Sequence, residues 1–156
     1  MRRMAVVDFH PSHAEAFRSL NEAWITRLFA LEARDREVLG DPVGHILAPG
    51  GQIFIALDEG EPAGCCALMA MADGGFELCK MAVDEGSQGK GLAKALIGAC
   101  VAWARARGAR RLYLESNSRL APALGLYRAS GFTDIPPERR PVSPYSRADV
   151  WMELRL

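Results

Sequence analysis

Short apolar runs separated by polar or glycine-containing turns fill much of the first half of the chain. Four runs have the length and composition of β-strands: residues 4–7, 52–57, 63–71 and 76–83. The segments 58–60 and 73–75 carry the Asp and Gly residues typical of tight turns. We therefore expect the last three runs to form an antiparallel meander, with residues 4–7 as a strand at the edge of the sheet.

Helical periodicity follows the first apolar run. Ser12 and Glu15 have the S-x-x-E spacing of a capping box, which predicts that a helix starts here. Apolar residues then recur at spacings of three and four along one helical face: Phe17, Leu20, Trp24, Leu28 and Leu31. A second short helix is predicted over residues 34–39, ended by Gly40.

The second half of the chain alternates between helices and strands. A long helix is predicted over residues 89–107, and its core-facing stripe is Leu92, Leu96, Ala99 and Trp103. A strand at 110–115, a helix at 122–130 and a last strand at 149–154 follow. The strand–helix–strand order from 76 to 115 implies a right-handed crossover between two parallel strands. The pattern predicts one α/β domain over residues 1–156, with a mixed sheet and helices on its faces.

Composition narrows the classes of function. The 156 residues suit one domain, and 19 basic residues balance 19 acidic ones, so no overall charge attracts nucleic acid or a membrane surface. There is no signal-peptide pattern and no apolar run of membrane-spanning length, so we expect a cytoplasmic protein. The four cysteines, Cys65, Cys66, Cys79 and Cys100, lack metal-ligand spacing, and we expect buried reduced thiols and no metal.

The turn between the fourth strand and the long helix has the sequence Gln88-Gly89-Lys90-Gly91-Leu92-Ala93. A strand, a glycine turn and a helix N-terminus together form a backbone site for an anion such as a phosphate. A P-loop is excluded because Asp84 occupies its first glycine position and Gly91 follows the lysine. A dinucleotide fingerprint is excluded because only two of its three glycines are present.

Two motifs at compatible spacing resemble the GNAT family of N-acetyltransferases. Met81-Ala82-Val83 followed by Gln88-x-x-Gly91-x-Ala93 is similar to the family's acyl-CoA signature, and Leu126-Tyr127 with Gly131-Phe132 is similar to its second signature. The resemblance covers essentially the whole chain. It implies a mostly antiparallel sheet of six to seven strands with about four helices, and strands 4 and 5 splayed apart.

The resemblance also implies acetyl-CoA as the donor cosubstrate. The pantetheine arm would lie in the opening beside the fourth strand, where the Met81 N–H is the candidate contact for the thioester carbonyl. Backbone N–H groups of the glycine turn would hold the pyrophosphate. The implied cofactor-binding residues are Met81, Ala82, Val83, Gln88, Gly89, Lys90, Gly91, Leu92, Ala93, Asn117 and Tyr127. Asn117 stands ten residues before Tyr127 instead of the usual seven, and capping the next turn is the alternative for it.

Candidate catalytic residues follow from the same comparison. Tyr127 matches the family's tyrosine, whose hydroxyl protonates the departing thiolate. Glu77 matches an acidic strand position that faces the acceptor, so it is the candidate base, with Glu115 as a second carboxylate able to take the proton. A role for Glu77 as an ion-pair partner is the alternative. Strict alternation predicts that Glu77, Cys79, Met81 and Val83 share one face of the strand.

The acceptor is not identified by any motif. We expect residues 21–37 and the proline-rich loop 136–149 to wall its site, with Trp24, Glu77, Glu115, Tyr145 and Arg147 as candidate contacts. Tyr145 and Arg147 could instead pin the loop to the last strand. The expected reaction is direct attack of a primary amine, of a small molecule or a protein, on the thioester in a ternary complex. A non-catalytic acyl-CoA sensor is the alternative, and the sequence leaves open a monomer or a homodimer.

Overall fold

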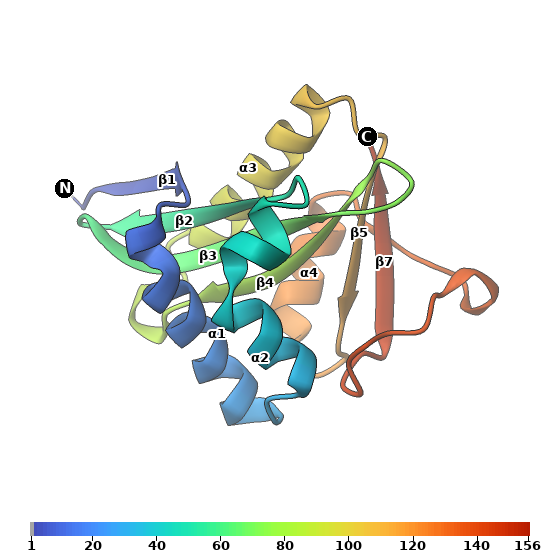
Figure 1. Cartoon of the computed structure of the whole chain (residues 1–156), viewed down its shortest axis with the longest axis horizontal. Coiled ribbons are helices and arrows are strands. Elements are labelled where there is room, and N and C mark those ends of the chain that lie inside the picture. The colour runs from blue at the N-terminus through green and yellow to red at the C-terminus, as the bar shows by residue number, and fades with distance from the viewer. Residues whose placement is uncertain (1) are drawn as a thin grey trace.

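The computed structural model describes residues 2–156 and contains a seven-stranded sheet with helices on both faces (Figure 1). The strands are β1 (Met4–Asp8), β2 (Gln52–Asp58), β3 (Glu61–Ala70), β4 (Phe76–Val83), β5 (Arg111–Ser116), β6 (Thr133–Asp134) and β7 (Val150–Arg155). Their order is β1-β2-β3-β4-β5-β7-β6. The predicted edge strand, the meander and the mixed, mostly antiparallel sheet are confirmed.

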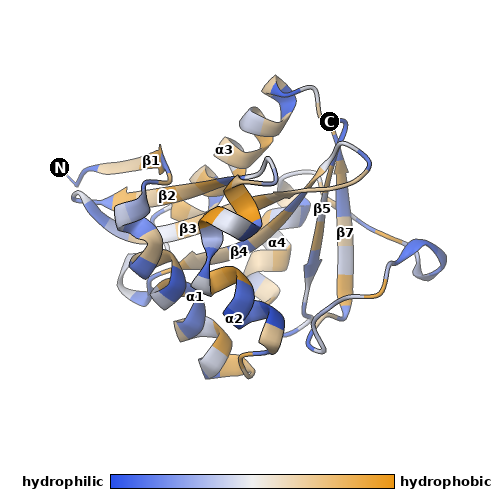
Figure 2. Cartoon of the chain, in the orientation of Figure 1, coloured by the Kyte–Doolittle hydropathy of each residue, from blue (hydrophilic) through white to orange (hydrophobic). Residues whose placement is uncertain are grey.

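The helices form two layers. Helices α1 (Ala14–Leu28) and α2 (Ala33–Gly40) lie on one face, and α3 (Leu92–Ala106) and α4 (Ala121–Ala129) lie on the other (Figure 1). Each layer has its own apolar cluster, because side chains of successive strand residues point to opposite faces. Hydrophobic residues gather along the central strands, whereas α2 carries a polar outer surface (Figure 2).

The two central strands are only briefly paired. β4 and β5 run parallel, and their register contains two pairs, Phe76 with Leu112 and Glu77 with Tyr113. Beyond these pairs the strands separate, so the predicted splay of the fourth and fifth strands is confirmed. The backbone edge of β4 after Glu77 therefore faces an opening instead of another strand.

A β-bulge in β4 overturns one prediction. The β3–β4 register shifts between Cys65 and Ala67, opposite Lys80, whose φ is 53°. One extra residue in a strand reverses the faces of the residues that follow it. Cys79 accordingly packs with the α1–α2 cluster, whereas Met81 and Val83 pack against the α3–α4 cluster. The expectation that Glu77, Cys79, Met81 and Val83 share one face is wrong, because alternation holds only in an unbroken strand.

The observed helix ends and buried helix faces differ in detail from those that the sequence periodicity predicts. The capping box at the start of the α1 region joins His10 and His13, not Ser12 and Glu15, because a short 3-10 turn, Pro11–His13, precedes the helix. α1 ends at Leu28, so Leu31 lies beyond it. The buried residues of α3 are Leu92, Leu96, Ile97, Cys100 and Ala104, whereas the predicted Ala99 and Trp103 are half-buried.

Several short elements were not predicted, among them the 3-10 turns Glu85–Ser87 and Pro137–Arg139. A π-helical turn, Val43–Leu47, follows α2, and the two-residue strand β6 pairs with β7. In the part of the chain that the structure describes, none of the helices has both the length and the apolar character needed to cross a membrane.

Candidate functional site

A cavity of about 1100 Å³ opens where β4 and β5 separate. Its walls come from α1, β4, the glycine turn, the end of β5, the start of α4 and the loop before β7. Every candidate site residue except Lys90 lines it: Trp24, Glu77, Met81, Ala82, Val83, Gln88, Gly89, Gly91, Leu92, Ala93, Glu115, Asn117, Tyr127, Tyr145 and Arg147. The fold thus brings residues from both signatures and from the expected acceptor wall to one continuous space.

The glycine turn has the backbone geometry of an anion site. Gly89 and Gly91 have φ values of 79° and 82°, a left-handed conformation that glycine adopts without steric cost. Gly91 is the N-cap residue of α3 and supplies no side-chain cap. The first N–H groups of α3 therefore lack intrahelical partners and carry the positive end of the helix dipole. Such an arrangement suits a pyrophosphate.

Lys90 is directed into the protein instead of the cavity. Its ammonium donates to the Gly86 carbonyl at 3.1 Å and lies 3.5 Å from the Asp58 carboxylate. Asp58 also accepts from Arg2 and from the Ser87 hydroxyl, and the Arg2 hydrogen bond is the main cause that lowers its pKa to about 2. Lys90 thus ties the turn to the end of β2.

Tyr127 lies beside the opening. Its ring packs edge-on against Phe132, with 5.8 Å between the ring centroids. Its hydroxyl makes no hydrogen bond with any other residue of the range 2–156. Burial raises the pKa of the phenol well above its usual range, and the thiols of Cys66, Cys100 and Cys79 raise it further. Tyr127 therefore carries its proton throughout the neutral range, as a proton donor must.

The four cysteines are free thiols, as expected: Cys65, Cys66 and Cys100 are buried and Cys79 is half-buried. Burial raises the pKa of the Cys79 thiol well above its ordinary value. Within the described residues, His, Cys, Asp and Glu side chains form no group of three arranged to hold a metal ion.

Two carboxylates, Glu77 and Glu115, line the end of the cavity that is expected to hold the acceptor. Burial, and then the nearby charge of Glu115, raises the pKa of Glu77 to about 7. Glu77 makes neither a hydrogen bond nor an ion pair with the rest of chain positions 2–156. Glu115 instead accepts hydrogen bonds from the Tyr113 hydroxyl and the Ser143 hydroxyl. Glu77 is thus the carboxylate that can both hold and release a proton near neutral pH.

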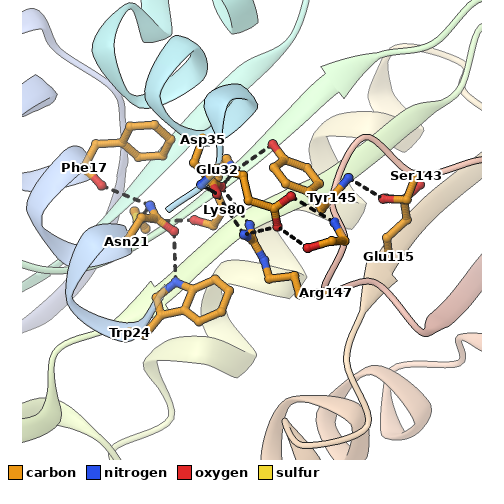
Figure 3. Close-up of polar contacts among 12 residues, drawn as sticks. Phe17, Asn21, Trp24, Glu32, Asp35, Lys80, Glu115, Ser143, Tyr145 and Arg147 are labelled. Carbon is orange, nitrogen blue, oxygen red and sulfur yellow. Dashed lines mark hydrogen bonds and ion pairs between the residues drawn. The ribbon is translucent and has the colours of Figure 1, made fainter. Parts of the chain in front are cut away.

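A buried ionic network lies beside these carboxylates (Figure 3). The Lys80 ammonium donates to Asp35 at 2.8 Å and to the Tyr145 hydroxyl at 2.9 Å. Arg147 binds both oxygens of Asp35, at 2.7 and 2.8 Å, and lies 3.5 Å from Glu32. Tyr145 and Arg147 therefore do pin the proline-rich loop, but they pin it to α2 and β4 instead of the last strand.

Trp24 on α1 lines the cavity, and a hydrogen bond to another α1 residue fixes its side chain. Its indole N–H donates to the Asn21 side-chain oxygen at 3.1 Å, and buried Asn21 donates to the Phe17 carbonyl at 3.0 Å. The Arg147 guanidinium lies 5.7 Å from the Trp24 ring. This wall of the cavity, where an acceptor is expected, thus combines α1 with the proline-rich loop, whereas α2 supports it from outside the cavity.

The side chain of Asn117 is used within the protein. Its amide nitrogen donates to the Arg147 carbonyl at 2.6 Å, and its oxygen accepts from the Arg119 N–H at 2.8 Å. These bonds match the capping alternative and join the end of β5 to the loop before β7. They do not favour the cofactor contact that the family pattern implied.

Sequence reasoning missed Asp35, Lys80 and Asn21. Asn21 bonds to Phe17 and Trp24 within α1, but the partners of Asp35 are distant in sequence: Lys80 is 45 positions away and Arg147 is 112. One signal was present: Lys80 is a charged residue inside the otherwise apolar run Leu78–Val83. A buried lysine in such a run requires an acidic partner elsewhere in the chain.

Comparison with known proteins agrees with this geometry. Residues 8–132 match the model of the acetyltransferase (GNAT) family. Over 125 residues, 79% of this chain, the sequence is 31% identical to mycothiol acetyltransferase of Beutenbergia cavernae. The chain spans 39% of the length of that relative.

Two solved structures share the fold. A GNAT-family acetyltransferase from Staphylococcus aureus Mu50 superposes with a TM-score of 0.89 at 17% identity, over 98% of this chain and 99% of that one. The protein yncA from Salmonella typhimurium, solved with its cofactor acetyl-CoA, has a TM-score of 0.74 at 18% identity, over 98% and 94% of the two chains.

Proposed function

The chain belongs to the GNAT family of acetyltransferases, and on that premise we propose that it transfers an acetyl group from acetyl-CoA to a primary amine. The observation that carries the proposal is the single cavity that runs from the glycine turn, past Met81 and Tyr127, to Glu77. Because residues expected at the donor and at the acceptor line one cavity of about 1100 Å³, the reaction that we propose is a direct transfer in a ternary complex. The amine belongs to a small molecule or to a protein.

The donor end uses backbone groups. The pyrophosphate of acetyl-CoA lies on the N–H groups of Gly89 to Ala93, and the pantetheine arm lies along the unpaired edge of β4 at Met81 and Val83. The N–H of Met81 donates to the thioester carbonyl oxygen and stabilises the negative charge that develops there. Two observations support this proposal. Gly89 and Gly91 are left-handed, and in the register of the described strands neither Met81 nor Val83 has a partner on β5.

The acceptor end uses a base and an acid. The acceptor ammonium gives one proton to Glu77, directly or through water, and the neutral amine attacks the thioester carbonyl carbon. The C–N bond forms and the C–S bond breaks. Tyr127 gives its proton to the departing sulfur, the new amide nitrogen releases its second proton to the tyrosine oxygen, and Glu77 returns its proton to water. The products are an N-acetylated amine and the free thiol of CoA.

A thiol-release assay tests the proposal. Purified protein is incubated with acetyl-CoA and each member of a broad panel of primary amines, and free CoA is measured. We expect release that depends on one class of amine, with the acetylated amine found by mass spectrometry. Tight binding of acetyl-CoA without release for any amine would instead identify an acyl-CoA sensor.

A further inference from the structure

Lys80 combines two unfavourable features at one position of β4. Its backbone has a φ of 53°, a left-handed conformation that is sterically unfavourable for any residue with a Cβ. Its side chain is only 3% exposed, although an ammonium is expensive to remove from water without a partner. Surrounding structure must stabilise both features for this bulge to persist.

The stabilising contacts come from two other parts of the chain (Figure 3). Asp35 on α2 is completely buried and bonds to both Lys80 and Arg147, so one carboxylate is shared by two cations. The centre of the Tyr145 ring is close to the same two cations, 4.5 Å from the Lys80 ammonium and 4.4 Å from the Arg147 guanidinium. Glu32 supplies the second negative charge that balances the group.

The bulge determines the backbone next to the cavity. In the register of the described strands, neither Lys80 nor Met81 is paired with β3 or with β5. The regular pairing of β4 is therefore interrupted at these two residues. The Lys80 side chain, one residue before Met81, anchors the bulge to Asp35 on α2.

We propose that Lys80 is a positioning residue for acetyl transfer: its ion pair with Asp35 fixes the bulge that orients the Met81 N–H. The same Asp35 holds Arg147, so one buried carboxylate sets both the thioester contact and the loop that walls the acceptor site. This inference rests on the proposed function for its catalytic part only. The coupling between β4 and the loop is a property of the protein without ligands.

Three variants test the inference, with one matched control. Lys80→Met removes the ammonium but keeps an apolar stem of nearly the same length, and Lys80→Arg keeps a cation able to reach Asp35. Glu153→Gln is the control, because Glu153 is also a buried carboxylate held by two guanidinium groups, at 2.8 Å from Arg111 and 2.5 Å from Arg139, but it does not line the cavity. Asp35→Asn weakens the shared anchor itself.

The kinetic measurement separates positioning from general stability. We expect Lys80→Met to lower kcat about 30-fold, because small displacements of a contact to the reacting atoms have large effects on rate. The KM for acetyl-CoA should change less than about threefold, because the glycine turn is untouched. Lys80→Arg should recover most of kcat, and Glu153→Gln should keep it. Unchanged kcat in Lys80→Met, or an equal loss in Glu153→Gln, would overturn the proposal.

Hydrogen exchange tests the coupling without any substrate. Lys80→Met and Asp35→Asn should each speed exchange at residues 80–83 and, together with them, at residues 145–148. Glu153→Gln should leave both segments unchanged. Faster exchange in β4 alone would contradict the shared anchor, even if the wild-type protein released no thiol and the proposed function itself failed.

Discussion

The carboxyl group of Glu77 lies in an environment that favours its neutral form. Burial comes first among the causes that raise its pKa to about 7, and the Glu115 charge comes second. A group with this pKa exchanges protons easily at neutral pH, which is what a general base requires. At the scale of single residues, the proposed chemistry depends on this carboxylate and on the Tyr127 phenol.

Replacing Glu77 with Gln should lower kcat/KM at pH 8 by about 100-fold, in the usual range for loss of a general base. The wild-type rate should rise with pH through about 7, because Glu77 becomes a carboxylate there. The variant should lose this step in its pH–rate profile. A step that persists in Glu77→Gln would transfer the role to another group, with Glu115 as the first candidate.

Stability provides the control for that variant. Because the folded-state pKa of Glu77 is raised above its ordinary value of 4.5, the folded protein holds this proton more tightly than the unfolded chain does. The charged carboxylate therefore destabilises the fold as pH rises from about 4.5 to about 7. Glu77→Gln should be at least as stable as the wild type at pH 8, so its low activity would not reflect unfolding.

Replacing Tyr127 with Phe should lower kcat by about 100-fold, since only the proton donor is lost. The KM for acetyl-CoA should change little, because the ring and its contact with Phe132 remain. The alkaline limb of the pH–rate profile should not report Tyr127 below pH 10, given the direction in which burial moves its pKa. Full activity in Tyr127→Phe would show that water protonates the thiolate.

At the scale of elements, α3 offers a matched pair of glycines. Gly91 is its left-handed N-cap, whereas Gly98 lies within the exposed part of the helix and a Cβ added there meets no atom within 4 Å. Gly98→Ala should stabilise the protein by about 0.5–1 kcal/mol through helix propensity. Gly91→Ala should destabilise it by about 1 kcal/mol through its positive φ.

Calorimetry measures both changes, and binding of acetyl-CoA adds a second readout. Gly91→Ala should weaken binding because it changes the backbone that would cradle the pyrophosphate, whereas Gly98→Ala should not. Equal melting temperatures for the two variants would contradict the left-handed cap.

Strand β4 shows which structural features a sequence pattern can predict and which it cannot. β4 was predicted to its exact bounds because turn residues stand on both sides, Gly74 and Gly75 before it and Asp84 after it. The bulge within β4 could not be predicted, because one inserted residue leaves the hydropathy of the run unchanged. Its position depends on the Lys80–Asp35 ion pair, which joins elements 45 residues apart.

At the scale of the whole molecule, bound acetyl-CoA should stabilise the fold. At a concentration of 100 times its Kd the ligand adds about 2.7 kcal/mol, which corresponds to a rise of about 5–10 °C in Tm for a chain of this size. Differential scanning calorimetry measures the shift. Acetylated pantetheine, which lacks the pyrophosphate, should give a smaller one. No shift at any concentration would reject the proposed donor.

The sequence indicated the candidate residues for both ends of the cavity, but it did not indicate the partners that hold the acceptor-side residues in place. The glycine turn and the Leu126–Phe132 motif are local, so each can be found within a few consecutive residues. On the acceptor side, Trp24 is held by Asn21 within α1, whereas Tyr145 and Arg147 are held by partners 65 and 112 residues away in sequence. Lys80 within its apolar run indicates that an acidic partner exists, but a single sequence does not identify Asp35 as that partner.

The separation of β4 from β5 sets a limit on how this protein can be improved. A sheet gains stability when neighbouring strands pair along their full length, but here the pairing ends after Glu77. Substitutions that extend the pairing of β4 with β5 would stabilise the sheet but close the opening proposed to bind acetyl-CoA. Selection or design for heat resistance should therefore accumulate changes in α3 and at the outer strands, and leave the residues along the opening as they are.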